Sequence, residues 1–388
     1  MSVPSRADFY CSEKFTWLSV DLEKRQTFSC CAARPEQVDL NWIKKNPGRL
    51  FNTPLLQTER QQMLQNQPVS SCDEVCWKPE QDNLVSRRQM LGSTLPTHTK
   101  IDVSNPEKLN IVLGSTCNLT CSYCCKQYSS SWLRDIQEHG SYLDQDRFRI
   151  TNRDRLALKI SQREHQESEG FQILLQEIQS FSQVKNTYIS GGEPFLYNNL
   201  PDLLNTLDNF SDKTVCYTGL GVDPKRFSAQ LSKIKNKNKL TIIVSGETCG
   251  SLYEFNRHGN SWDNFVVNIN ELQKQGFDYE FSLVISNLTI FGIIDFVETF
   301  PDKKLQYQFC AVPDFLSVNV LDDTSKQTLI EKLQQSNLPF KDEVCHTMSQ
   351  SCTTQQRNDL SIYVKEFARR RNLDLSIFPE SFYFWIKG

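Results

Sequence analysis

Six short apolar runs, separated by longer amphipathic stretches, constrain the fold of this chain more than any other feature. The runs cover residues 109–114, 186–191, 214–219, 240–246, 279–286 and 305–312. Between them, helical periodicity covers residues 171–183, 198–209, 224–234, 261–275 and 290–300. Strands that alternate with helices indicate βαβ units, which build a parallel sheet. The sequence therefore predicts an α/β fold, with further helices at 323–335 and 357–371.

The cysteine content is a second constraint, because 14 of the 388 residues are cysteine. The chain starts MSVPSRADFYCSEKF, without the apolar stretch of a secretory signal, and its longest apolar runs are far below the roughly 20 residues of a spanning helix. We therefore expect a cytoplasmic location and no membrane partner. In a reducing compartment, excess cysteine indicates metal ligation rather than disulfides.

The charges nearly balance, with 43 Lys and Arg against 46 Asp and Glu and a net charge of −3. No block of like charge stands out along the sequence. A nucleic-acid partner that is held by a basic surface is therefore not expected.

Three cysteines form a tight group directly after the first apolar run. Cys117, Cys121 and Cys124 have the spacing C-x3-C-x2-C, and Tyr123 precedes the third. Thiolates are the preferred ligands of iron–sulfur clusters, so three on one loop can hold three irons of a [4Fe–4S] cluster. The fourth iron is then open to a ligand that is not protein. The alternative is a zinc site or a set of buried free thiols.

This motif, at this place after a first strand, resembles the signature of the radical S-adenosylmethionine (SAM) superfamily. The resemblance implies a partial parallel (β/α)6 barrel in which Cys117, Cys121 and Cys124 bind the cluster and the open iron binds SAM. It also places Tyr123 among the residues that bind SAM. An electron donor such as flavodoxin or ferredoxin would reduce the cluster. Cleavage of SAM would then give methionine and a 5′-deoxyadenosyl radical that abstracts hydrogen from the substrate.

Two further stretches resemble SAM-binding segments of that superfamily. Gly191, Gly192 and Glu193, followed by proline, resemble its GGEP element, where exposed carbonyls and the glutamate suit the ammonium group of SAM. Ser245 and Glu247 follow the fourth apolar run, where the superfamily places polar side chains against the ribose. An ordinary glycine turn is the alternative for residues 191–192.

Two more candidates lie later in the chain. The segment YEFNRHGNSWDNF resembles a Y-x-x-x-R-x-G-x-x-W run, which makes Arg257 a candidate partner for the SAM carboxylate. Asn287 follows the fifth run at a position where relatives place an amide. The alternatives are a surface salt bridge for Arg257 and a turn residue for Asn287. His258 is expected to face solvent or cap an element.

The first 80 residues hold a second set of cysteines, together with a predicted hairpin (15–20 with 26–31) and a predicted helix at 56–66. Their order resembles the auxiliary-cluster modules called SPASM or twitch domains, although in the better-known members this module follows the barrel. The resemblance implies a second [4Fe–4S] cluster held by Cys11, Cys30, Cys72 and Cys76. Cys31 in place of Cys30 stays open. Structural zinc and the absence of a metal also stay open as alternatives.

These readings predict three segments: a cysteine-rich module (1–100), a radical SAM core barrel (105–320) and a helical C-terminal tail (321–388). The expected function is hydrogen abstraction from a substrate, either a small molecule such as a sugar or nucleoside, or a peptide. The alternative is a zinc- or iron–sulfur-stabilised binding protein on a degenerate barrel without radical chemistry.

Overall fold

The structure is a computed structural model that describes residues 9–30, 33–95, 98–143 and 168–388. Cys31 and residues 144–167 lie outside the described residues. The described residues form two compact units. The first contains residues 9–115, 168–216 and 233–241, and the second contains residues 116–143, 217–232 and 242–388.

A mostly parallel sheet forms the centre of the first unit, with the strand order β3-β2-β1-β4-β6-β7. The strands are β1 (Trp17–Asp21), β2 (Gln26–Phe28), β3 (Glu36–Gln37), β4 (Lys108–Val112), β6 (Val184–Ser190) and β7 (Ser211–Thr218). β4 pairs in parallel with β6, and β6 with β7. The unit also contains the start of β8 (Leu240–Ser245), where the N–H of Thr214 donates to the carbonyl of Lys239 over 2.7 Å.

The predicted N-terminal hairpin is confirmed by the antiparallel pair β1–β2. Its first strand also joins the main sheet, because β1 pairs in parallel with β4 and places Val20 opposite Ile111. Both residues are fully buried, as is usual for parallel strands that are covered on both faces. The cysteine-rich segment is therefore built onto the first strand of the predicted α/β core.

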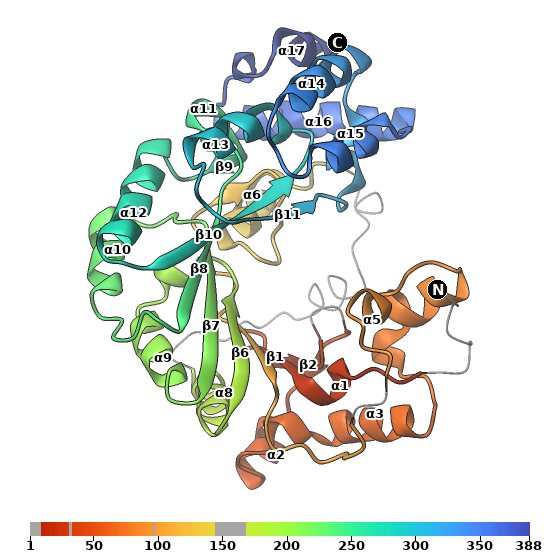
Figure 1. The fold of residues 1–388 in the computed structure, drawn as a ribbon, viewed down its shortest axis with the longest axis vertical. Coiled ribbons are helices and arrows are strands. Elements are labelled where there is room, and N and C mark those ends of the chain that lie inside the picture. Colours follow the sequence, from red (N-terminus) through yellow and green to blue (C-terminus); the bar gives the residue numbers. More distant parts are fainter. Residues whose placement is uncertain (1–8, 31–32, 96–97, 144–167) are drawn as a thin grey trace. The chain divides into compact units, whose positions relative to one another are not determined.

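Helices alternate with the later strands of this unit along the chain, with α8 before β6 and α9 between β6 and β7 (Figure 1). The helices are α1 (Glu13–Thr16), α2 (Leu40–Lys45), α3 (Pro54–Leu64), α4 (Lys78–Gln81), α5 (Arg87–Met90), α8 (Glu169–Gln179) and α9 (Leu200–Leu207). The predicted helix at 56–66 is confirmed as α3. It starts at Thr53, whose hydroxyl accepts the N–H of Leu56, and Pro54 at its first position has no N–H to satisfy.

The second unit continues the same alternation of strands and helices. Its strands are β5 (Thr120–Cys121), the rest of β8, β9 (Arg257–His258), β10 (Asp278–Ile285) and β11 (Leu305–Phe309). β10 pairs in parallel with β11. The helices up to β11 are α6 (Ser130–His139), α10 (Pro224–Leu231), α11 (Gly250–Asn256), α12 (Trp262–Lys274) and α13 (Ile293–Thr299).

The tail of the second unit is helical, as predicted. It contains α14 (Asp323–Gln335), α15 (Lys341–Ser349), α16 (Thr354–Arg371) and α17 (Glu380–Lys387). A capping box between Thr353 and Gln356 starts α16, and Asn372 in the left-handed conformation ends it.

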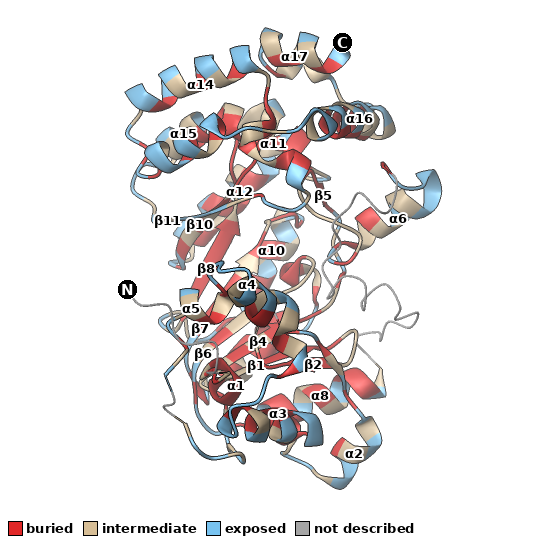
Figure 2. Cartoon of the chain, turned by 90° about the vertical axis from the view of Figure 1, so that its right-hand side faces the viewer, coloured by how far each residue is buried: buried red, intermediate tan, exposed pale blue. Residues whose placement is uncertain are grey.

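The predicted α/β class and its six strands are confirmed, since β4, β6, β7, β8, β10 and β11 follow the chain order of a partial (β/α)6 barrel. Figure 2 shows these strands as largely buried, apart from the exposed edge strand β11, while helices expose one side. No described helix has the length and the apolar character that crossing a membrane requires.

Candidate functional site

The loop that carries the three clustered cysteines is held by the start of α6. The N–H of Cys117 donates to Ser130 Oγ over 3.1 Å, and Ser131 Oγ donates to the carbonyl of Cys117 over 2.9 Å. The indole of Trp132 donates to the carbonyl of Cys121 over 3.0 Å. Backbone and side-chain bonds from one helix therefore fix two of the three cysteines.

A two-residue antiparallel ladder, β5–β9, places Cys121 opposite Arg257. Nη1 of Arg257 lies 3.9 Å from the Cys121 sulfur. The other guanidinium nitrogens bind Glu247, with Nε to Oε2 at 3.0 Å and Nη2 to Oε1 at 2.6 Å. Tyr123 joins the same group, because its hydroxyl bonds both Arg257 and Glu247.

This group is buried, and Glu247 and Arg257 expose only 0% and 3% of their side chains. Burial acts against the charge of Arg257, but Glu247, Tyr123 and Cys121 together outweigh it, so the pKa of Arg257 is raised. Burial raises the pKa of Tyr123. The structure therefore brings together three residues that the sequence predicted as separate SAM contacts. Their contact with SAM stays a prediction.

The three thiols interact with one another. Burial raises the pKa of Cys124 well above its ordinary value, and Cys125, Cys121 and Cys117 add to the effect. Sulfur also accepts backbone donors here, because the N–H of Leu119 lies 3.4 Å from Cys117 Sγ. A metal that accepted the thiolates would remove the cost of bringing them together.

Helix α16 also supports this loop, which the sequence did not predict. The hydroxyl of Tyr363 donates to the carbonyl of Ser122, and Arg371 Nε donates to Thr120 Oγ1 over 2.9 Å. Thr120 also bonds His258, whose Nδ1 lies 3.1 Å from its hydroxyl. Burial, with Arg371 close by, lowers the pKa of His258. No local motif marks Tyr363 or Arg371, since their role depends on where the tail folds.

The glycine pair after β6 lies against the chain just beyond β4. Gly191 and Gly192 both have positive φ, of 98° and 54°. A Cβ atom on Gly191 would lie 2.7 Å from the carbonyl oxygen of Gly114. Glu193 is buried and its carboxylate accepts the N–H of Phe195 over 3.2 Å. The close approach of the Gly114 backbone therefore explains why a glycine stands at position 191.

We expect the substitution Gly191→Ala to lower the free energy of unfolding by about 2–5 kcal/mol, because backbone strain and a steric clash add. Gly92→Ala is the matched control in the same unit, since Gly92 also has positive φ (65°) but nothing lies within 4 Å of its added Cβ. It should cost about 1–2 kcal/mol. Urea unfolding measures both, and equal losses would contradict the proposed backbone clash.

The remaining predicted residues lie at strand ends. Ser245 ends β8 and is half-buried. Asn287 follows β10, is fully buried, and donates through Nδ2 to the carbonyl of Phe315 over 2.8 Å. Its Oδ1 has no hydrogen-bond partner among the described residues. A buried acceptor without a partner is costly, so this oxygen is suited to a ligand donor.

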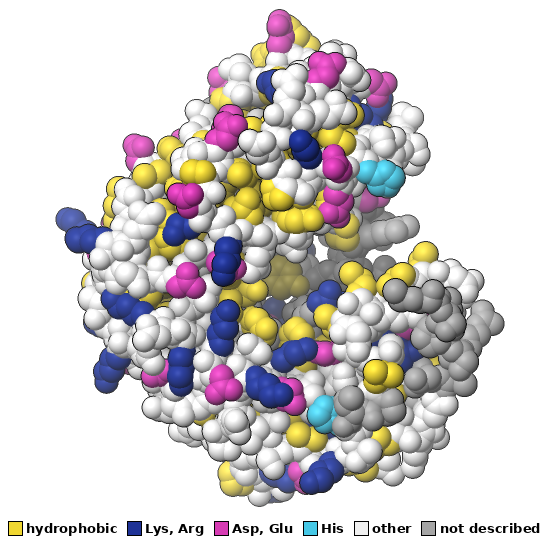
Figure 3. All heavy atoms as spheres, viewed as in Figure 1, with side chains coloured by type: hydrophobic (Ala, Val, Ile, Leu, Met, Phe, Trp, Pro, Cys, Tyr) yellow, Lys and Arg dark blue, Asp and Glu magenta, His cyan; other side chains and the backbone are white. Residues whose placement is uncertain are grey.

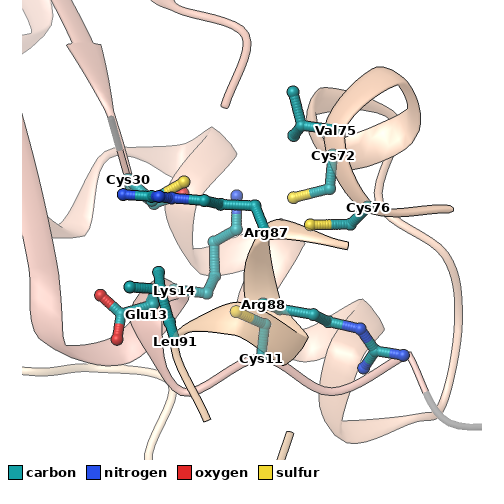
Figure 4. A pocket seen from close by; sticks show the side chains of 11 residues that line it. Cys11, Glu13, Lys14, Cys30, Cys72, Val75, Cys76, Arg87, Arg88 and Leu91 are labelled. Atoms are coloured by element: carbon teal, nitrogen blue, oxygen red, sulfur yellow. The ribbon is translucent and has the colours of Figure 1, made fainter. Parts of the chain in front are cut away.

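The N-terminal cysteines meet around one pocket. Its lining includes Cys11, Cys30, Cys72 and Cys76, the four residues that the resemblance to auxiliary-cluster modules implied (Figure 4). Cys11 precedes α1 and Cys30 follows β2. Cys72 ends a 3-10 turn (Ser70–Cys72), and Cys76 lies in the π-helical turn that follows it (Asp73–Trp77). Such turns are frequent at functional sites.

Apolar side chains surround these thiols. Three of the four cysteines belong to a buried cluster with Tyr10, Phe15, Met63, Val69 and Trp77. Burial raises the pKa of Cys11 to about 12, and the neighbouring Cys72, Cys30 and Cys76 contribute. Burial likewise raises the pKa of Cys76 to about 12. Thiols whose ionised forms are destabilised by burial and by neighbouring thiols, as at Cys11 and Cys76, belong to a donor set that a metal centre would stabilise.

Every cysteine in the described ranges is free, so no disulfide competes for these sulfurs there. Within the same ranges, no three His, Cys, Asp or Glu side chains lie close enough together to hold a single metal ion. In a [4Fe–4S] cluster each thiolate binds a different iron, so the ligands of a cluster need not meet at one point.

Acidic and basic side chains lie interspersed over the face drawn in Figure 3. This distribution agrees with the near balance of charges in the sequence, 43 basic against 46 acidic residues. Charges of mixed sign do not create the one-sided field that steers a nucleic acid.

No protein-family model matches the chain, and no curated protein matches it. Among solved structures, it is similar to native anSMEcpe with bound AdoMet and the Kp18Cys peptide, at 16% identity and a TM-score of 0.38, over 59% of each chain. It is also similar to SuiB of Streptococcus suis bound to S-adenosylmethionine, at 16% identity and a TM-score of 0.33, over 59% of this chain and 44% of that one. A third, SuiB bound to the precursor peptide SuiA, has 17% identity and a TM-score of 0.35, over 70% and 48%. The match spans less than two thirds of each of these chains.

Proposed function

We propose that this chain is a radical SAM enzyme. Cys117, Cys121 and Cys124 would hold a [4Fe–4S] cluster with one iron open to SAM. When bound, the cluster and SAM supply reductive cleavage of a C–S bond and a radical that abstracts hydrogen from the substrate. The observation that carries the proposal is the set of three interacting thiols on one loop that hydrogen bonds from α6 hold in place.

The residues around the loop fit such a cluster. Hydrogen bonds and nearby charge at the ligand sulfurs tune a cluster. Cys117 Sγ accepts an N–H from Leu119, and Cys121 Sγ lies beside the guanidinium of Arg257. The cysteine loop therefore suits a cluster through hydrogen-bond donors at its sulfurs as well as through its thiols.

The chain's own residues would exclude water and hold the loop in place. Trp132 and Tyr363 are 4% and 3% exposed, and each donates a hydrogen bond to a carbonyl of the cysteine loop. Gly191 and Gly192 keep the turn after β6 free of side chains, which would leave their backbone available to the ammonium group of SAM. Asn287 would offer its buried Oδ1 to the same cofactor.

The proposal includes a second [4Fe–4S] cluster at the pocket of Cys11, Cys30, Cys72 and Cys76. Four thiolates complete the ligands of such a cluster, so no iron would remain open. The shared pocket supports this assignment. Zinc is the competing occupant by ligand type, because four thiolates suit Zn²⁺. Against it, no three such side chains of the described residues lie close enough together to hold a single ion.

The substrate class stays a prediction, either a small molecule such as a sugar or nucleoside, or a peptide. So do the electron donor, flavodoxin or ferredoxin, the cytoplasmic location and the division into three segments. The alternative function, a binding protein without radical chemistry, requires a defective cofactor site. The intact cysteines and glycines count against it.

Anaerobic reconstitution with iron and sulfide tests the proposal. We expect about eight irons per chain, the content of two [4Fe–4S] clusters, and dithionite-dependent formation of 5′-deoxyadenosine and methionine from SAM. About four irons with cleavage intact would remove the second cluster. A reconstituted, reduced protein that does not cleave SAM would contradict the enzyme assignment.

A further inference from the structure

A buried lysine shares the pocket of the four N-terminal cysteines. Lys14 lies on α1 and lines the pocket together with Cys30 and Cys72 (Figure 4). Only 2% of its side chain is exposed. Its Nζ donates to Glu59 Oε2 over 2.7 Å and to Ser71 Oγ over 3.1 Å. The Ser71 hydroxyl in turn lies 3.9 Å from Cys72 Sγ.

One ammonium donor of Lys14 remains after these bonds. An ammonium group carries three N–H donors, and the described residues take up two of them at Glu59 and Ser71. The charge of Lys14 also interacts with the thiol groups of Cys72 and Cys30. A buried cation thus has both a donor and a charge available to the sulfurs of the pocket.

Two other charged residues of the lining, Arg88 and Glu13, are committed to partners. Arg88 holds Glu80 with two bonds of 2.7 Å each. Glu13 holds Lys108 with bonds of 2.9 and 3.0 Å. Lys14 therefore differs from them, because its pairing with Glu59 is a single bond and its second bond leads, through Ser71, to a cysteine.

We propose that Lys14 raises the reduction potential of the iron–sulfur centre held by the four N-terminal cysteines, and that Glu59 opposes it. The inference rests on the proposed second cluster. Reduction adds one electron, and hence one negative charge, to a centre that already carries four thiolates. A buried cation beside the sulfurs stabilises that added charge, and burial protects the interaction from screening by salt. Lys14 would act as a positioning and tuning residue rather than as a ligand.

The ion pair supplies two variants with opposite expected effects. Lys14→Met removes the cation but keeps the length of the side chain, so the reduced state loses stability. Glu59→Gln removes the anion and leaves the charge of Lys14 less compensated, so the reduced state gains stability. A purely structural role of the pair would not reverse the sign between the two variants.

The test is a potentiometric titration, followed by electron paramagnetic resonance, of the reconstituted full chain. A Cys117→Ala, Cys121→Ala, Cys124→Ala background leaves only the centre of the N-terminal cysteines, and iron analysis establishes its content. At the midpoint potential of this background, Lys14→Met should lower the ratio of reduced to oxidised centre about tenfold, which is a shift of 59 mV for one electron. Glu59→Gln should raise the ratio by a similar factor.

Lys44→Met is the matched control, because Lys44 forms an exposed ion pair with Glu169 in the same unit. It should leave the potential unchanged. Shifts of the same sign in the Lys14 and Glu59 variants, or no shift, would overturn the inference while the second cluster stands. Zinc or no metal in the triple-alanine background would instead refute the second cluster, and this inference with it. If Lys14→Met does not fold, Glu59→Gln alone still tests the expected rise.

Discussion

Replacing Cys121 by alanine should abolish the cleavage of SAM. Cys121 is one of only three protein ligands of the proposed cluster, and it also faces Arg257 across the β5–β9 ladder. Loss of even an outer partner of a metal ligand commonly costs about 10–100-fold, so loss of the ligand itself should cost more than about 100-fold. Formation of 5′-deoxyadenosine by the reconstituted, dithionite-reduced variant measures the effect.

Cys72→Ala is the informative comparison for this prediction. It removes a ligand of the second proposed cluster, so it should lower the iron content while cleavage of SAM survives at least in part. Cys249→Ala is the matched control, because Cys249 is a half-buried cysteine whose nearest polar partner is the Thr299 hydroxyl, 3.6 Å away. It should retain iron and activity. Equal loss of folded protein in the Cys121 and Cys72 variants would indicate a structural role for both cysteines.

The six strands could be predicted because periodicity and length are local properties of the sequence. Their order in the sheet followed from the resemblance to a (β/α)6 barrel. The place where the N-terminal hairpin joins the sheet could not be predicted. β1 lies in parallel beside β4, a pairing between Trp17–Asp21 and Lys108–Val112. No local pattern in either segment shows which strand it will pair with, because pairing across some 90 residues depends on the packing of the whole sheet.

The residues of the candidate sites also divide into those that the sequence could predict and those that it could not. The resemblance to auxiliary-cluster modules implied Cys11, Cys30, Cys72 and Cys76, and the structure places all four around one pocket. Lys14 was missed, because a single lysine in a polar stretch gives no signal of burial. Tyr363 was missed for a related reason, since it reaches the cysteine loop from a helix more than 200 residues away.

The bonds of Arg257 add a second part to its role in the site. Sequence resemblance suggested the carboxylate of SAM as a partner, which stays a prediction, and the structure shows that Arg257 also binds the carboxylate of Glu247. A guanidinium that binds one carboxylate with two hydrogen bonds fixes the position of that carboxylate. Arg257 therefore holds Glu247, Tyr123 and the strand of Cys121 in one arrangement, and this makes it a structural support of the proposed cluster site.

Arg257→Met should consequently destabilise the protein strongly. The change leaves Glu247, 0% exposed, as a buried carboxylate without its cation. Removing one partner of a buried ion pair costs about 3–5 kcal/mol. Denaturant unfolding followed by fluorescence measures this loss. The double variant Arg257→Met, Glu247→Gln should recover part of it, because no buried charge is then left alone.

Arg357→Met is the matched control within the same unit. Arg357 pairs with Asp323 over 2.8 Å, but their side chains are 35% and 86% exposed. Exposed pairs contribute about 0–1 kcal/mol, so this variant should unfold almost as the parent does. Arg257→Lys should fall between the two, because it keeps the charge and loses the planar fork. Equal unfolding free energies for Arg257→Met and Arg357→Met would contradict the supporting role of Arg257, while a loss of iron from folded Arg257→Lys would place that role at the cysteine loop itself.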